Sequence, residues 1–397
     1  MQEIKLTIFN RGDGGEHIRR MLDEFERLYK IHVSIEILDW GVAWSRLVGC
    51  ALYGNGPDIS EVGSTWVMDF VRMNAVSNLT PSEVIRLGSE QDFFPTNWNS
   101  GVAKNPSSDE PMVWAIPWTS DVRLAHYRRD LFENAGIDPT HTFEHADTLN
   151  EAIHQLKLKD PMRALVLGTL LSYNNLHIIA SWIWDAGGDL IAPHGVRVGF
   201  DSPQALKGMQ AYFGLGRYVP EERHRIFDLD ADKFFMAGEA AILFTGFWIV
   251  RDLALVAPVV RDNLGLAAMP GASFVGGTHL LAWKHSPRRE QAILLADFLC
   301  KRSSEYQLYP THALPAYVPS WQNFPLFSEP YSTAMFNALQ KGRSFPVSPL
   351  WGLVEKRLTD AIPMLWDKVW ETGGKDIEKT LAENIIPLAR RINITLE

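Results

Sequence analysis

Tryptophans placed next to turns are the residues of this sequence whose chemistry is most informative. Some follow predicted strands early in the chain, and others lie beside loop signals further on. In order they are Trp40, Trp44, Trp66, Trp118, Trp248 and Trp351. An indole face can pack against the apolar C–H patch of a sugar ring while polar neighbours bond to its hydroxyls. The set therefore indicates a carbohydrate-binding surface, although each tryptophan taken singly is equally typical of a half-buried core residue.

Signatures of catalytic and cofactor chemistry are missing from the sequence. It has no GxGxxG after a strand, no GxxxxGK[ST], no HExxH and no GxSxG. These motifs supply the parts of dinucleotide, phosphate, zinc-protease and hydrolase sites. We therefore expect no cofactor, no metal and no catalytic residue.

Two clusters have side chains of metal-binding type, but their surroundings favour other roles. His141 and His145 stand four residues apart without a clear third ligand, so we favour two surface histidines. The spacing of an EF-hand is approached by four acidic residues, Asp228, Asp230, Asp232 and Glu239. Lys233 replaces the glycine that the EF-hand turn requires. We interpret the aspartates as first-turn residues that complement a helix dipole.

Length, composition and net charge indicate which class of protein this is and which partners it is expected to bind. A chain of 397 residues is longer than one hydrophobic core usually supports, which predicts two domains. Hydrophobic residues at 46% and charged residues at 21% are typical of a soluble globular protein. A net charge of −9 argues against nucleic acid, whose phosphates are bound by lysine and arginine. Cys50 and Cys300 lie in apolar surroundings and are expected to be buried thiols on helices.

The elements that must position these residues follow from hydrophobic periodicity. Strands are predicted at residues 4–10, 33–37 and 58–62, with helices at residues 18–29 and 44–52 between them. Such a βαβαβ unit calls for a parallel sheet, and ligands of open α/β sheets bind beyond the carboxyl ends of the strands. Those ends are residues 10–16, 39–44 and 63–66.

Capping residues mark where further helices begin. Thr80 has Glu83 three residues later, which predicts a capping box, and Thr148 with Glu151 repeats that spacing. Ser202 stands before a proline and predicts another helix start.

Strands return late in the chain after a helix-rich middle. They are predicted at residues 264–268 and 278–283, and an amphipathic helix follows over residues 288–301. This order suggests that the chain re-enters its first domain and that both domains are discontinuous.

The sequence resembles the extracellular solute-binding proteins of family 1, which deliver carbohydrates to ABC importers. The resemblance spans nearly the whole chain. It is carried by the ordered segments GPDISEVGSTWVMDFVRMNAVSNLT, AIPWTSDVRLAHYRRDLFENAGID, WDAGGDLI and DKFFMAGEAAILFTGFWIVRDL, and by the run from LGLAAMPG through FVGGTHLLAWKHS to THALPAYVPSW.

This resemblance implies an α/β, two-lobed periplasmic-binding-protein fold, type II-like, with a ligand cleft between lobes joined by hinge segments. Hinges are expected near residues 118–123 and 260–264, with a third crossing after Trp321. The expected lobes are residues 1–118 with 263–325, and residues 119–262 with 326–397.

The resemblance also implies ligand-binding positions in both lobes. They are Trp40, Trp44, Thr65, Trp66, Trp118, Asp121, Phe247, Trp248, Gly277, Thr278, His279 and Trp351. Arg123 and Asp185 are further candidates, although a structural salt bridge from Arg123 to Asp121 is equally plausible. Asp13 lies in the first loop, where backbone N–H groups at the following helix start could meet ligand oxygens, and a simple tight turn is equally consistent.

The function implied is that of a receptor that captures a sugar, with an oligosaccharide favoured, and delivers it to the permease subunits of an ABC transporter. We expect a monomer that is periplasmic or extracellular and membrane-associated. The start MQEIKLTIF has no signal-peptide pattern, so we expect any signal peptide to have been removed, and a lipid anchor is left open. The alternative is a glycoside hydrolase, which needs two facing carboxylates, for example Asp121 with Asp185 or Glu61.

Overall fold

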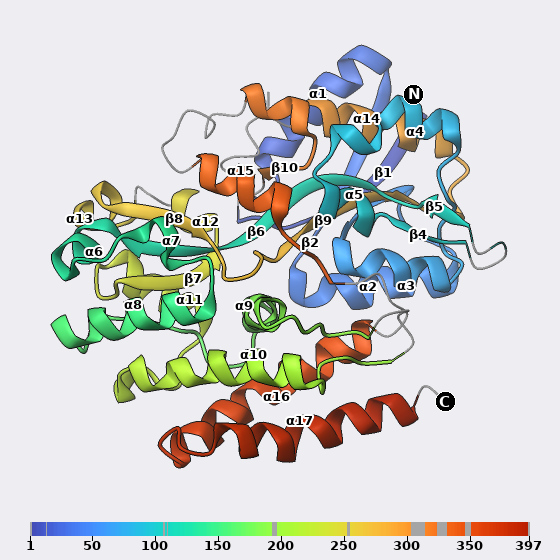
Figure 1. The fold of residues 1–397 in the computed structure, drawn as a ribbon. Coiled ribbons are helices and arrows are strands. Elements are labelled where there is room, and N and C mark those ends of the chain that lie inside the picture. The colour runs from blue at the N-terminus through green and yellow to red at the C-terminus, as the bar shows by residue number, and fades with distance from the viewer. Residues whose placement is uncertain are drawn as a thin grey trace. The chain divides into compact units, whose positions relative to one another are not determined.

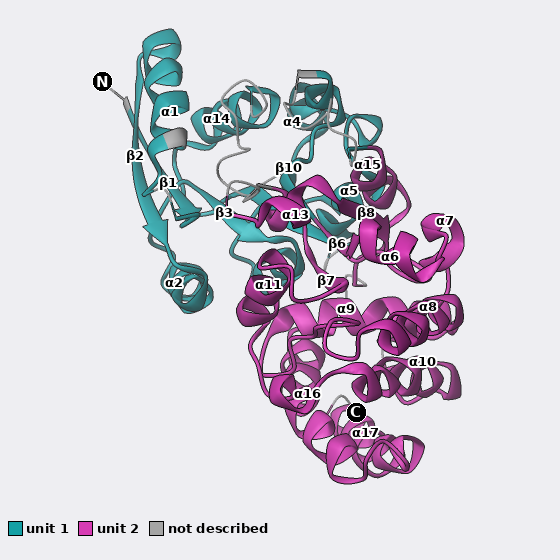
Figure 2. Cartoon of the chain, turned by 90° about the vertical axis from the view of Figure 1, so that its left-hand side faces the viewer, with its two compact units in different colours: residues 1–121, 275–332 teal, residues 122–274, 333–397 magenta. Residues whose placement is uncertain are grey.

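The computed structural model describes residues 2–12, 14–105, 108, 110–192, 197–251, 255–302, 314–323, 332–345 and 351–395. The chain forms two compact units, shown in Figure 2: unit 1 is residues 1–121 with 275–332, and unit 2 is residues 122–274 with 333–397. The chain leaves unit 1 between Asp121 and Val122, returns after Phe274, and leaves again after Ser332. The second crossing therefore lies later than residues 260–264, where the resemblance places a hinge.

Unit 1 contains a mixed sheet whose first three strands form the predicted βαβαβ unit. Across the sheet the strands are β10 (Leu314–Pro315), β6 (Ile116–Arg128), β9 (Val275–Ala282), β3 (Ile59–Gly63), β1 (Gln2–Phe9) and β2 (Ile31–Leu38). Strand β1 pairs in parallel with both β2 and β3, which confirms the parallel arrangement, and β9 adds to β3 in the antiparallel direction. A separate hairpin is formed by β4 (Val102–Lys104) and β5 (Pro111–Val113).

Helices cover both faces of this sheet (Figure 1). The helices of unit 1 are α1 (Glu16–Tyr29), α2 (Trp40–Tyr53), α3 (Val67–Arg72), α4 (Pro81–Leu87), α5 (Pro95–Ser100) and α14 (Arg289–Arg302), with 3-10 turns η1 (Ser64–Trp66), η2 (Glu90–Asp92) and η6 (Val318–Asn323). Side chains alternate between the faces of a strand, so Ile8 packs in a core with α1 and α14 while Phe9 packs in another with α2 and α3. Helix α2 is thereby held against the core at the carboxyl end of β1.

Unit 2 combines a small antiparallel sheet with many helices. The second part of β6 pairs with β7 (Ile242–Gly246) and β8 (Leu264–Ala268). The helices are α6 (Arg129–Ala135), α7 (Pro139–Thr142), α8 (Ala146–Lys159), α9 (Tyr173–Asp185), α10 (Pro203–Phe213), α11 (Asp228–Met236), α12 (Trp248–Arg251), α13 (Pro258–Asp262), α15 (Ser332–Lys341), α16 (Trp351–Glu371) and α17 (Ile377–Ile394), with 3-10 turns η3 (Gly214–Tyr218) and η4 (Glu221–Arg223). Helices α9 and α10 pack on α16 and α17 in the lower part of Figure 1.

The predicted helix starts are correct in two cases out of three. Thr80 forms the capping box with Glu83, and the Ser202 hydroxyl accepts the N–H of Ala205. The start predicted at Thr148 is wrong, because α8 already begins at Ala146 and the Thr148 hydroxyl donates to the carbonyls of Thr142 and His145. Asp185 of α9 supplies the missing cap by accepting the N–H of Ala146 at 2.8 Å.

The two cysteines are buried, and the two histidines of the predicted cluster form ion pairs. Cys50 on α2 and Cys300 on α14 are buried, as predicted, and form no disulfide. His141 pairs with Glu144 and His145 pairs with Asp185. In the described ranges, no group of three or more His, Cys, Asp or Glu side chains is arranged to hold a metal ion. Among the same residues, no helix combines the length and apolar character needed to cross a membrane.

Candidate binding surfaces of the two units

Three of the predicted site residues come together in unit 1, and we call them the tryptophan surface. Trp40 and Trp44 lie on α2, and Trp66 closes the turn η1 after β3. The ring centre of Trp66 is 5.7 Å from that of Trp40 and 5.3 Å from that of Trp44. The helix predicted over residues 44–52 begins earlier, at Trp40, so α2 includes most of the segment predicted to follow the second strand. Helical spacing of four residues places Trp40 and Trp44 on one face, one turn apart.

Buried phenyl rings support the tryptophan surface from below. Trp40 lies 3.9 Å from Phe9 and Trp44 lies 5.7 Å from Phe70, measured between ring centres. Both phenylalanines are at most 1% exposed, whereas Trp40 is 50% exposed and Trp44 is 37% exposed. The indoles therefore rest on the core and present the rest of their area to solvent. Thr65, in the same turn as Trp66, is half-buried.

Beside these rings, a buried ion pair lies between the middle of strand β3 and the residues that end and follow strand β1. Glu61 is fully buried, accepts the backbone N–H of Phe9 at 2.8 Å and forms a salt bridge with Arg11. The guanidinium of Arg11 in turn lies 5.3 Å from the ring centre of Trp118. Trp118 is only 1% exposed, so it belongs to the core in this structure. Asp13, predicted in the first loop, lies outside the described residues.

The three predicted positions on β9 are enclosed by neighbouring strands and helices. Gly277 has φ +135°, and a methyl group there would lie 2.0 Å from the Thr119 carbonyl oxygen, so only glycine permits this approach. The hydroxyls of Thr278 and Thr119 lie 2.7 Å apart. His279 is fully buried, its Nε2 donates to the Asn97 carbonyl at 3.0 Å, and burial lowers its pKa to about 4. Asp121, the last residue of unit 1 before the first crossing, is half-buried on β6.

In unit 2 the structure brings Arg123 and Trp248 together. The guanidinium carbon of Arg123 lies 5.2 Å from the ring centre of Trp248, within the range of a cation–π contact. Arg123 is buried and Trp248, the first residue of α12, is half-buried. Phe247 is fully buried and belongs to the core.

Asp232 completes this group, and the sequence did not predict its role. Its interpretation as a first-turn helix aspartate is wrong, because only Asp228 and Asp230 occupy the first turn of α11. Asp232 is 5% exposed and accepts the indole N–H of Trp248 at 2.7 Å. Burial raises the pKa of Asp232 to about 6, against the opposing effect of the hydrogen bond from Trp248. Its position three residues before the buried Phe235 was the available signal, since both share one helix face.

The remaining predicted residues of unit 2, Trp351 and Asp185, are engaged by other groups of the chain. Trp351 is 3% exposed and stacks on Phe345 with ring centres 3.9 Å apart. His177, which the sequence did not single out, stacks on Phe274 at 4.0 Å, and its Nδ1 accepts from Arg123 at 3.1 Å. Burial and the charge of Arg123 hold the pKa of His177 well below its usual value, so it is neutral. Asp185 has both carboxylate oxygens engaged, by His145 and by the start of α8.

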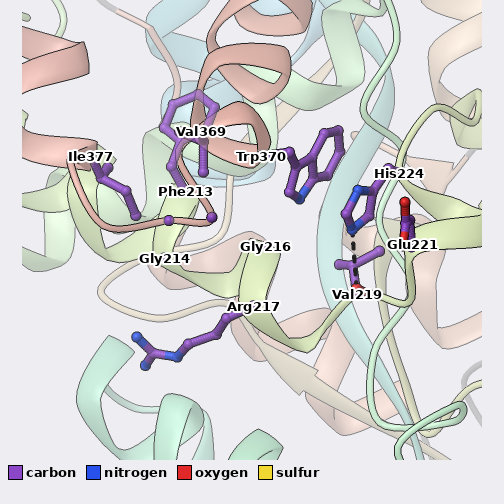
Figure 3. Close-up of a pocket in the computed structure, with 12 residues that line it drawn as sticks. Phe213, Gly214, Gly216, Arg217, Val219, Glu221, His224, Val369, Trp370 and Ile377 are labelled. Atoms are coloured by element: carbon purple, nitrogen blue, oxygen red, sulfur yellow. Dashed lines mark hydrogen bonds between the residues drawn. The ribbon is translucent and has the colours of Figure 1, made fainter.

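A cavity of about 370 Å³ in unit 2 has none of these residues in its lining, which is drawn in Figure 3. Its lining includes Phe213, His224 and Trp370. The Trp370 ring is already stacked on His224, at 4.0 Å and 4°, and on Trp366, at 5.0 Å and 21°. Arg217 points away from the cavity in Figure 3 and donates to Asn150. Both of these contacts are stacked, so they cover ring face of Trp370 that a sugar would need.

The fold and the sequence together define the class of protein. The chain belongs to the bacterial extracellular solute-binding protein family, whose sequence model matches residues 20–336. It is 21% identical over 280 residues to the diacetylchitobiose binding protein DasA of Streptomyces coelicolor, a match that covers 68% of this chain and 62% of that one.

Two solved structures show the same fold. The sugar-binding protein MalE from Xanthomonas citri has a TM-score of 0.82 and 20% identity, covering 100% of this chain and 97% of that one. An ABC transporter solute-binding protein from Thermotoga lettingae, bound with α-D-tagatose, has a TM-score of 0.78 and 20% identity, with both chains covered at 100%. The predicted α/β, two-lobed periplasmic-binding-protein fold is thereby confirmed.

Proposed function

We propose that this chain is the substrate-binding protein of an ABC importer and that it captures a sugar. The observation that carries the proposal is the tryptophan surface of unit 1, where Trp40 and Trp44 are 50% and 37% exposed on one helix face. Exposed indoles held on a rigid core are the groups that stack on pyranose rings. Membership of the solute-binding family, and relatives whose names specify sugars, support the same conclusion.

The spacing of the two indoles supports an oligosaccharide as ligand. Side chains four residues apart on a helix lie about 5–6 Å apart at Cβ, which is similar to the length of one ring in a sugar chain. Trp40 and Trp44 can then meet consecutive rings, as a chain of two or more units requires. An uncharged ligand also suits a surface dominated by aromatic side chains.

Binding without turnover is part of this proposal. A glycoside hydrolase needs two carboxyl groups free to face the scissile bond. Of the candidate carboxylates, Glu61 is buried in its ion pair with Arg11, and Asp185 holds the start of α8 and His145. These contacts support structural roles for both. Delivery to permease subunits, and a periplasmic or extracellular location, follow from the importer function that we propose.

Isothermal titration calorimetry against a saccharide panel tests the proposal. The panel contains α-D-tagatose, diacetylchitobiose, maltose and longer maltodextrins, and each sample is analysed by chromatography after prolonged incubation. We expect at least one oligosaccharide to bind with a stoichiometry of one and to be recovered intact. Failure of every saccharide to bind, or steady accumulation of cleaved product, would contradict the proposal.

A further inference from the structure

Three contacts of different kinds hold the indole of Trp248, all of them within unit 2. Asp232 accepts its N–H at 2.7 Å, and Arg123 lies 5.2 Å from its ring centre. Gly246 provides the space for the ring, because a methyl group there would lie 1.8 Å from Cζ3 of Trp248. Gly246 and Arg123 are register partners on β7 and β6, so the ring packs at one point of that strand pair.

The hydrogen bond to Asp232 supplies what the other two contacts lack, a fixed rotation of the ring. The torsion that turns an indole about its Cβ–Cγ bond has a broad energy profile, so rotamer preference alone does not set the plane of the ring. Packing on a glycine and attraction to a cation both act on the ring as a whole. A directional N–H···O bond at the indole edge selects one orientation.

Stability does not explain why a carboxylate occupies this place. Asp232 lies on the buried face of α11, near Phe235, with 5% of its surface exposed. Ionising a buried carboxyl group is unfavourable, and the raised pKa of Asp232 reports that cost. An apolar side chain of similar size would avoid the cost, as it does when buried ionic groups are replaced in other proteins. Perturbed carboxyl groups of this kind concentrate at functional sites.

We propose that Asp232 is a positioning residue of the sugar site, which acts by holding the half-buried indole of Trp248 in one orientation for stacking. This inference assigns Trp248 to sugar contact, and it therefore rests on the proposed function. A ring that is already ordered loses less freedom when the sugar binds, so the affinity is higher than with a mobile ring. Asp232 itself need not touch the sugar.

The first test uses the free protein and needs no ligand. The indole N–H signals are recorded by ¹⁵N NMR, and the signal of Trp248 is assigned by its loss in Trp248→Phe. We expect Asp232→Leu to shift this signal and to accelerate its exchange with solvent by about ten-fold or more, as loss of a charge-assisted hydrogen bond implies. Asp230→Leu, which alters an exposed carboxylate of the same helix, serves as the matched control and should leave the signal unchanged.

The second test is a double-mutant cycle with diacetylchitobiose and maltose as probes. Asp232→Leu should weaken binding about ten-fold in the parent chain, with a melting temperature equal to or above that of the parent. In the Trp248→Phe background, which has a ring but no N–H, the same substitution should have no further effect.

The outcomes of these tests distinguish failure of the role of Asp232 from failure of the proposed sugar function. An equal loss of affinity in both backgrounds, or an unchanged indole signal in Asp232→Leu, would show that Asp232 does not act through Trp248. A lower melting temperature with unchanged indole exchange would assign Asp232 a structural role and overturn the inference. If neither probe nor any other saccharide of the panel binds, the sugar function fails and with it the role of Trp248 as a platform.

Discussion

The tryptophan surface of unit 1 gives the most direct test of sugar binding, through the substitution Trp40→Ala. Trp40 is 50% exposed and rests on Phe9. A tryptophan that becomes fully buried covers about 150–250 Å², so about half of that area is available to a ligand. At about 25 cal/mol per Å² this corresponds to about 2–3 kcal/mol if the sugar covers all of it.

A sugar ring covers one face of the indole rather than all of its exposed area. The expected loss is therefore about 1–2 kcal/mol, or about five-fold to thirty-fold in the dissociation constant. Trp40→Ala also removes the buried half of the indole, which rests on Phe9, so the free energy of unfolding should fall by about 2–3 kcal/mol in the free protein. Calorimetric titration with whichever saccharide binds, combined with thermal melting of the free protein, measures both quantities.

Helix α2 offers a matched control for this substitution. Tyr53 ends the same helix and is 79% exposed, so Tyr53→Ala removes an exposed aromatic ring at the opposite end of the helix from Trp40. We expect Tyr53→Ala to bind as tightly as the parent. If Trp40→Ala also binds as tightly as the parent, or if the two variants lose equal affinity, the tryptophan surface is not the sugar platform.

Three further predictions concern other parts of the chain. Asp121→Asn should weaken sugar binding about ten-fold or more while the protein stays folded, because charge-assisted hydrogen bonds to sugar hydroxyls are lost; unchanged affinity would assign Asp121 a structural role. Asp232 has a folded pKa of about 6, raised from 3.8, so its contribution to stability is full below about pH 4 and is lost as the pH rises through about 6. When the pH is lowered from about 7 to about 5, the free energy of unfolding measured with urea should therefore rise by about 1 kcal/mol more in the parent than in Asp232→Asn. An equal rise in both proteins would show that the pKa of Asp232 is not raised. Small-angle scattering should show a smaller radius of gyration when sugar binds, since the chain crossings between the units permit hinge motion; an unchanged radius at saturation would speak against closure.

Local patterns in the sequence predicted the first βαβαβ unit and two helix starts correctly. Strong alternation and helical periodicity are properties of neighbouring residues, so β1, α1 and β2 could be recognised without tertiary information. Thr148 shows the limit of such patterns. It has the spacing of a capping box, but Asp185, which lies 39 residues after Ala146, caps α8 two residues earlier.

Exposure of the individual tryptophans could not be predicted in the same way. Trp40, Trp118 and Trp351 all lie beside turn signals, yet Trp40 is half exposed while the other two are at most 3% exposed. The difference arises from partners that only the fold brings close, such as Arg11 over Trp118 and Phe345 against Trp351. The role of Asp232 was missed for the same reason, because its partner Trp248 lies 16 residues further on.

The two units hold their candidate platforms by different physical means. Trp40 is positioned by contact with Phe9 and Trp66, and dispersion and apolar burial of this kind depend little on ionisation. Trp248 is positioned by Asp232 and Arg123, whose contributions depend on charge. Protonation of Asp232 weakens the acceptor of the indole N–H without altering the rings of unit 1. A change in sugar affinity near the pKa of Asp232 that disappears in Asp232→Leu would therefore arise from Trp248 of unit 2 and not from the tryptophan surface of unit 1.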